Sequence, residues 1–132
     1  MTRLRRASPL LLALLLLGAG ALHFLKPASY DDLIPSWLPG SARAWVYGSG
    51  VAELGCGLLL LPPRTRRLGA TATALLLLAV FPGNIEMAVH PGDTPRWIAL
   101  ARLPLQIPLV LWALQVRRVS ARGSRSASAD RG

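Results

Sequence analysis

The sequence has few charged residues for a chain of its length. Only 16% of the 132 residues are Asp, Glu, Lys or Arg, against about 25% in an average soluble domain. Hydrophobic residues make up 52%. A soluble core of this size needs polar faces between its apolar segments, and the long apolar runs here have none. The composition therefore argues against a soluble globular protein and favours an integral membrane protein.

Residues for metal binding and thiol chemistry are also scarce. The chain has one cysteine, Cys56, and two distant histidines, His23 and His90. A single thiol excludes an internal disulfide and a CxxC dithiol, and this set does not predict a zinc site. The sequence also shows no nucleophile–base pair and no phosphate-binding loop. We therefore assign no metal site and no catalytic residue, and favour a non-catalytic role while leaving enzyme activity open.

Long apolar runs, by contrast, are abundant. A bilayer core about 30 Å thick is crossed by about 20 helical residues. Four stretches approach this length and are separated by loops rich in proline and glycine: residues 9–25, 44–61, 68–89 and 97–116. The sequence therefore predicts an all-α fold, a four-helix transmembrane bundle in one domain of residues 1–118. The polar segment 119–132 is predicted to be a disordered basic tail.

The basic residues predict how the spans are oriented. The chain has 15 Lys and Arg against 6 Asp and Glu. Most of the basic residues lie before the first span, between the second and third, and after the fourth. Because Lys and Arg of short loops stay in the cytoplasm, we expect a multi-pass protein of the cell membrane with cytoplasmic N- and C-termini. The arginines flank apolar spans and do not gather on one face with aromatic residues, so nucleic acid is not an expected partner.

The first span has an alternative interpretation. Its arginines, its leucine run and the triplet Ala19-Gly20-Ala21 also fit a cleaved signal peptide. Cleavage would leave three spans in the same orientation, so the charges do not decide between the two interpretations.

Polar side chains inside the predicted spans indicate where a functional site would lie. An ionisable group at the centre of a membrane helix costs about 2.5 to 3.5 kcal/mol unless it is paired or hydrated. Counted at a rise of about 1.5 Å per residue, all of these groups fall in the outer half of the membrane. We interpret them as one intramembrane polar cluster. Its members are His23, Tyr47, Glu53, Asn84, Glu86, Arg102 and Gln106.

Charge balance within the cluster leads to two expectations. Arg102 lies at a depth between Glu86 and Glu53 and is expected to reach either. With one arginine for two glutamates, either His23 or a carboxyl group must carry a proton. We expect it on Glu53, the deeper acid, because burial favours the neutral form. The alternative, that these groups only hold the helices together, stays open.

Two segments beside the cluster complete this interpretation. Gly50 and Gly57 share a helix face with Glu53, and small residues on that face allow a neighbouring helix to approach closely. The first outer loop, residues 26–43, is rich in proline and apolar residues. We expect it to lie on the outer interface and cover the cluster.

Five ordered segments between His23 and Trp112 form a recognisable pattern. They are His23-Phe24 with Pro27 and Tyr30, Ile34-Pro35 with Leu38-Pro39, Val46-Tyr47-Gly48-Ser49-Gly50 with Glu53, Phe81-Pro82-Gly83-Asn84-Ile85 with Met87-Ala88, and Arg102-Leu103-Pro104-Leu105-Gln106. Together they resemble the DoxX-like family of small bacterial integral membrane proteins. The resemblance implies a four-helix membrane fold with the first helix retained. Glu53, Asn84, Arg102 and Gln106 match the family pattern, whereas Glu86 departs from it.

The resemblance also implies a link to membrane redox complexes, including quinone-coupled oxidation of sulfur compounds. The leading hypothesis is an accessory subunit of a membrane redox or stress-related complex, with the lipid bilayer and a membrane or redox protein as partners. The second is a quinone-reactive subunit, in which Glu53 or His23 passes protons to a quinone positioned by Arg102 and Tyr47. Quinone is the one cofactor considered. The third hypothesis is a small transporter or channel.

Overall fold

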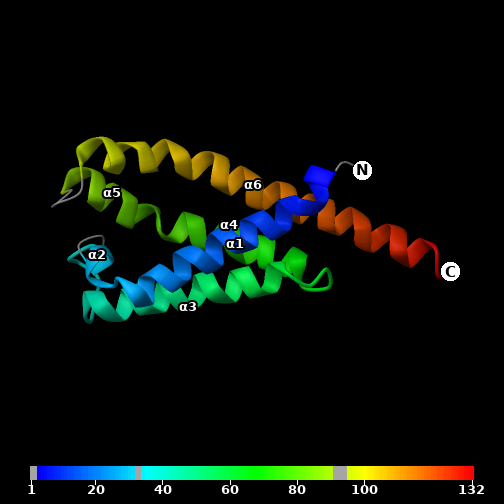
Figure 1. Cartoon of the computed structure of the whole chain (residues 1–132), viewed down its shortest axis with the longest axis horizontal. Coiled ribbons are helices and arrows are strands. Elements are labelled where there is room, and N and C mark those ends of the chain that lie inside the picture. The colour runs from blue at the N-terminus through cyan, green and yellow to red at the C-terminus, as the bar shows by residue number, and fades with distance from the viewer. Residues whose placement is uncertain (1–2, 32–33, 91–94) are drawn as a thin grey trace.

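Every regular element in the described part of the chain is a helix, which confirms the all-α prediction. The computed structural model describes residues 3–31, 34–90 and 95–132. The elements are α1 (Arg3–Leu25), α2 (Ala28–Asp31), α3 (Ala42–Leu60), α4 (Arg66–Ala79), α5 (Phe81–Val89) and α6 (Arg96–Ala129). The long helices run along the long axis of the molecule, with α1 against α3, α4 against α6, and α5 beside the first part of α6 (Figure 1).

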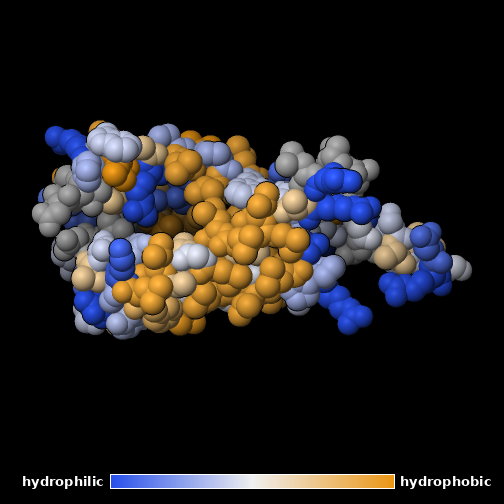
Figure 2. Space-filling view, viewed as in Figure 1, coloured by the Kyte–Doolittle hydropathy of each residue, from blue (hydrophilic) through white to orange (hydrophobic). Residues whose placement is uncertain are grey.

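Three helical stretches in the described residues are long and apolar enough to cross a membrane. They are Arg6–Leu25, Arg66–Val89 and Arg96–Ala129, the second being α4 and α5 together. The helix α3 has the expected place and length but is less apolar, because it contains Arg43, Glu53 and several glycines. Its crossing of the membrane stays a prediction. Apolar side chains cover the middle of the molecule, and hydrophilic ones gather toward both ends (Figure 2).

The third predicted span is interrupted. The helix α4 ends at Ala79 and α5 begins at Phe81, with Val80 between them. Pro82 lies in the first turn of α5. It has no N–H and cannot donate to the carbonyl four residues earlier, which weakens a continuous helix at this point. Beyond the interruption, α5 packs on α6.

The predicted disordered tail, residues 119–132, is largely helical in the structure. The helix α6 continues to Ala129. Extending a helix that is already formed avoids the cost of nucleation, and the alanines and arginines of this segment are good helix formers. The predicted disorder rested on the lack of apolar residues to bury in this segment, and burial is not a requirement for continuing a helix.

The packed core occupies one half of the molecule. Leu12, Leu60, Ala70 and Ala113 are almost completely buried there, at contacts between α1, α3, α4 and α6. In the other half, α1 packs on α3 and α5 packs on α6, and the two pairs are joined mainly through α4. Because nothing in the described residues fills the space between the pairs as the core does, a cavity remains there.

Helices α1 and α3 approach each other at glycine positions. A Cβ atom on Gly50 would lie 2.9 Å from the Cβ of His23 and 2.8 Å from Cε2 of Phe24. A Cβ on Gly20 would lie 2.9 Å from Cγ of Leu54. These distances are too short for real contacts, so the two helices meet only because both positions lack side chains. The expected close approach at Gly50 is confirmed, and the neighbouring helix is α1.

Replacing Gly50 with alanine should weaken this contact. We expect Gly50→Ala to lower the thermal midpoint in detergent, because overpacking costs about 1 to 3 kcal/mol. That cost outweighs the gain of up to about 1 kcal/mol from removing a helical glycine. The matched control is Gly48→Ala, since no atom lies within 4 Å of a Cβ placed there. Its midpoint should stay unchanged or rise. Equal midpoints for the two variants would contradict this account of the α1–α3 contact.

Candidate ligand-binding site

A cavity of about 710 Å³ lies between the α1–α3 pair and the α5–α6 pair, next to α2. It appears as a recess at the end of the molecule that carries α2 and α5 (Figure 2). Most of its lining is apolar, and the polar groups on it come from both helix pairs. Five of the seven predicted cluster residues line it: His23, Glu53, Asn84, Arg102 and Gln106.

The wall formed by α1 and α3 carries an imidazole next to a carboxylate. Nδ1 of His23 lies 2.7 Å from the carbonyl oxygen of Ala19 and 3.1 Å from Oε2 of Glu53. A carbonyl oxygen has no proton to give, so Nδ1 must be the protonated nitrogen that donates to it. Oε2 of Glu53 is buried and has no hydrogen-bond partner among the described residues. The cavity wall therefore presents one buried acceptor that the described residues leave unsatisfied.

Tyr30 in α2 lies over this histidine. The two rings are stacked, with centroids 4.1 Å apart and planes at 18°. Burial raises the pKa of the Tyr30 phenol, the Glu53 carboxylate raises it further, and Arg102 acts in the opposite direction. Tyr30 thus lies within electrostatic reach of the charged groups of both walls. Its helix is held beside α3 by Arg43, whose Nη2 donates to Oδ2 of Asp31 at 2.8 Å.

The first outer loop also covers the cavity, as the sequence predicted. In addition to Tyr30, the loop contributes Ile34, Trp37 and Leu38 to the lining. Residues 32–33 of this loop lie outside the described residues. Apolar side chains of this loop near the polar groups of the cavity reduce the contact of those groups with water, which strengthens electrostatic interactions between them.

The wall formed by α5 and α6 is organised by two amides. Nδ2 of Asn84 donates to Oε1 of Gln106 at 2.9 Å, and Nε2 of Gln106 donates to the carbonyl oxygen of Leu77. Leu77 belongs to the last turn of α4, where carbonyls lack helical donors. Gln106 therefore links α6 to both sides of the interruption between α4 and α5, and both amides are buried.

Arg102 lies on the same wall, and its predicted pairing with a glutamate is wrong. Neither Glu53 nor Glu86 has an oxygen within 4.0 Å of its guanidinium, and each instead faces a histidine. Among the described residues, Arg102 donates to Sδ of Met87 at 3.4 Å, a weak acceptor. Most of its five N–H donors are thus unused by the described residues, because Glu53 lies across the cavity on the opposite wall.

Two predicted cluster residues lie outside the cavity lining. Tyr47 stacks on Phe24 with centroids 5.3 Å apart. Oε1 of Glu86 lies 3.2 Å from Nδ1 of His90, an exposed residue one turn later. Glu86 is two positions from Asn84, which places the two side chains about 200° apart around the helix. A similar level along the predicted spans therefore does not bring them to one site.

Three contributors to the site were not among the predicted cluster residues. Tyr30 was assigned to the covering loop and to the resemblance pattern that begins at His23-Phe24. Met87 was noted only as part of a resemblance, and the carbonyl of Leu77 has no signature in a side-chain pattern. No group of three or more His, Cys, Asp or Glu in the described residues is arranged to hold a metal ion.

The fold and site define a helical protein with candidate membrane spans and a lined cavity between two helix pairs. The chain belongs to a family described as a domain of unknown function (DUF8561), whose family model matches residues 12–117. Every residue that lines the cavity falls within that range. No curated protein and no solved structure matches the chain.

The role of Gln106 leads to a stability prediction. We expect Gln106→Leu to lower the free energy of unfolding by about 2 to 4 kcal/mol, because it leaves the Leu77 carbonyl and the Asn84 amide buried without partners. Unfolding by SDS in mixed micelles measures this change. The control is Gln115→Leu on the same helix, an exposed position that should change stability by less than about 0.5 kcal/mol. A loss for Gln106→Leu no larger than the control's would contradict the linking role.

Proposed function

We propose that this chain is a four-span integral protein of the cell membrane, with both termini in the cytoplasm, that binds a small amphipathic molecule in the cavity. In this proposal it acts as an accessory subunit of a membrane redox or stress-related complex. The cavity lies in the outer half of the membrane, and the basic end of the molecule lies at the cytoplasmic surface.

The packing of α3 supports its crossing of the membrane. It lies against α1, which is one of the three candidate spans, and the two meet at Gly20 and Gly50. A helix of 19 residues is also close to the length that a bilayer core requires. The same packing favours retention of α1 over cleavage after Ala21, because cleavage there would remove Gly20 and most of α1 from this contact.

The observation that carries the ligand-binding proposal is that Oε2 of Glu53 lies 3.1 Å from Nδ1 of His23 but has no hydrogen-bond partner among the described residues. Buried polar atoms are almost always hydrogen-bonded, and an exception requires an explanation. This atom lies on the wall of a cavity large enough for a small molecule. A hydroxyl or amino group of a ligand would satisfy it.

The two walls define the chemistry of the ligand. A donor group lies at Glu53, an acceptor or anionic group lies at Arg102, and an apolar body contacts the remaining lining. Such a small set of oriented polar groups in an apolar cavity is typical of small-molecule sites. The described residues show no arrangement for catalysis by this chain alone, which favours the accessory role that the DoxX-like resemblance implies.

The second candidate function is that of a quinone-reactive subunit. One observation favours a quinone as the ligand. The stacked rings of His23 and Tyr30 form a flat aromatic surface beside Glu53, which suits a planar headgroup. A quinol hydroxyl can donate to Glu53, and a quinone oxygen can accept from Arg102. Tyr47 does not take the positioning role that the sequence predicted for it, since it lies outside the cavity.

Reporter fusions test the topology. With four spans, reporters at the N-terminus and at the C-terminus report the same side, the cytoplasm, and a reporter in the loop after residue 61 reports that side as well. If α3 does not cross, the two termini lie on opposite sides of the membrane. A reporter inserted between α1 and α3 should report the outer side whether or not α3 crosses the membrane, and it serves as the internal control.

Small molecules retained by the purified protein test ligand binding. Extraction from protein in mild detergent, followed by mass spectrometry, should yield an amphipathic compound from the wild-type protein. We expect Glu53→Gln and Arg102→Gln each to retain at least about tenfold less of the compound, since a hydrogen bond to a charged group contributes about 1.5 to 3 kcal/mol. Glu86→Gln makes the same change outside the cavity and should retain as much as the wild type.

The identity of the compound separates the two candidate functions. Recovery of a quinone, together with stabilisation by an added short-chain quinone that Glu53→Gln abolishes, supports the quinone-reactive subunit. Recovery of another amphipathic compound supports the accessory role without quinone chemistry. Equal retention by all variants, or no retained compound in the wild type, contradicts ligand binding at this site.

A further inference from the structure

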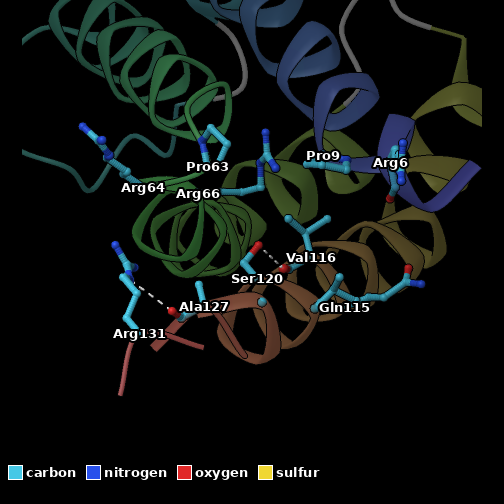
Figure 3. A pocket seen from close by; sticks show the side chains of 13 residues that line it. Arg6, Pro9, Pro63, Arg64, Arg66, Gln115, Val116, Ser120, Ala127 and Arg131 are labelled. Atoms are coloured by element: carbon cyan, nitrogen blue, oxygen red, sulfur yellow. Dashed lines mark hydrogen bonds between the residues drawn. The ribbon is translucent and has the colours of Figure 1, made fainter. Parts of the chain in front are cut away.

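A second pocket lies at the opposite, basic end of the molecule. Its volume is about 530 Å³. It is formed by the amino end of α1, the turn between α3 and α4, and the carboxyl half of α6. Figure 3 shows Arg64, Arg66 and Arg6 along one side of it, and Ser120, Val116 and Gln115 along the other.

The lining of this pocket is strongly cationic. Four arginines contribute to it, Arg6, Arg64, Arg66 and Arg131, and none of its 13 lining residues is acidic. The wall formed by α6 includes the small residues Gly123 and Ala127, which leave room opposite the arginines. A pocket with this charge attracts an anion.

Arg66 is held in place by the backbone of α3. Its Nε donates to the carbonyl oxygen of Leu60 at 2.9 Å, and its Nη2 donates to that of Leu61 at 2.8 Å. These bonds satisfy carbonyls at the end of α3 and use two of the five N–H donors of the guanidinium. The remaining donors are fixed in position, so binding an anion there costs little side-chain entropy.

Arg6 and Arg64 are exposed, and their charges are available to a ligand. Among the described residues, neither forms an ion pair with an acid. The first turn of α4, which begins at Arg66, has no side-chain cap, and its partial positive charge adds to that of the arginines.

The pocket also lies at the level where the helices leave the apolar belt. Two of the candidate spans begin at Arg6 and at Arg66. On the side of the apolar belt the lining includes Pro9, Val116 and Val119. The pocket therefore combines arginines at the membrane surface with apolar contacts directed along the spans, which is the arrangement of a phospholipid: a phosphate above and acyl chains below.

We propose that this pocket binds the phosphate-bearing headgroup of an anionic phospholipid. Arg66 is the fixed anchor for the phosphate, and Arg6 and Arg64 add charge from either side. The proposal rests on the membrane placement proposed above but not on a ligand in the outer cavity. A free phosphate shares the headgroup's chemistry, but it would make no use of the apolar lining.

Lipid retention in mixed micelles tests this site. The variant is Arg6→Gln with Arg64→Gln, which leaves the Arg66 contacts with α3 intact. Native mass spectrometry of protein with added phosphatidylglycerol or phosphatidylcholine should show preferential retention of phosphatidylglycerol by the wild type. The double variant should retain phosphatidylglycerol about tenfold more weakly, since each basic residue near an anionic surface contributes a substantial part of the binding.

The matched control is Arg118→Gln with Arg122→Gln, two exposed arginines at the same end that do not line the pocket. It changes net charge equally and should retain phosphatidylglycerol as the wild type does. Equal loss in both double variants overturns the proposal, because it would show a response to net charge alone.

An experiment with soluble phosphates distinguishes a lipid headgroup from a free phosphate. Inorganic phosphate and glycerol phosphate, added to protein in zwitterionic micelles, should raise the thermal midpoint far less than phosphatidylglycerol does at the same concentration. Equal stabilisation by the soluble anions would overturn the lipid assignment. Because this experiment needs no bilayer and no ligand in the outer cavity, its failure is separate from failure of the topology or of the cavity ligand.

Discussion

The contact between α1 and α3 at Gly20 and Gly50 is the constraint on which the outer half of the structure depends. It brings two helix backbones together without side chains between them, and it places His23 of one helix beside Glu53 of the other. Beyond the packed core, α1 lies mainly against α3, and α5 lies mainly against α6. The cavity lies between these two helix pairs.

The two walls satisfy their polar groups in different ways. On α5 and α6, the amides of Asn84 and Gln106 bind each other and the backbone at the α4–α5 interruption. On α1 and α3, His23 donates to a backbone carbonyl, and Oε2 of Glu53 has no hydrogen-bond partner among the described residues. Each wall thus has one group with unused hydrogen-bonding capacity, Arg102 on the first and Glu53 on the second. Groups left in this state are suited to binding a ligand.

Much of the fold could be predicted from the sequence, because long apolar runs bounded by proline and glycine define helices with little ambiguity. Five of the seven predicted cluster residues line one cavity, and helix rise was the basis on which they were grouped. The position of a residue along a helix does not show in which direction its side chain points. Glu86 was therefore included in the predicted cluster, although its side chain faces away from that of Asn84. The pairing of Arg102 with a glutamate was wrong for a related reason, since a shared level does not place two groups on the same wall. The role of the Leu77 carbonyl could not be predicted, because a backbone acceptor leaves no pattern in the side chains. The helical tail could not be predicted either, because it continues a helix that is formed elsewhere.

The cavity lining includes Leu15 of α1 and Leu105 of α6, which are 48% and 55% exposed. With the membrane placement and the ligand proposed above, these side chains would border hydrocarbon, and the gap between the helix pairs would open to the lipid. A compound with a long tail would then enter headgroup first and leave its tail among the acyl chains. Occupancy of such an opening is governed by partitioning into the membrane, so a sparingly soluble compound reaches a high local concentration at the protein even where its aqueous concentration is negligible.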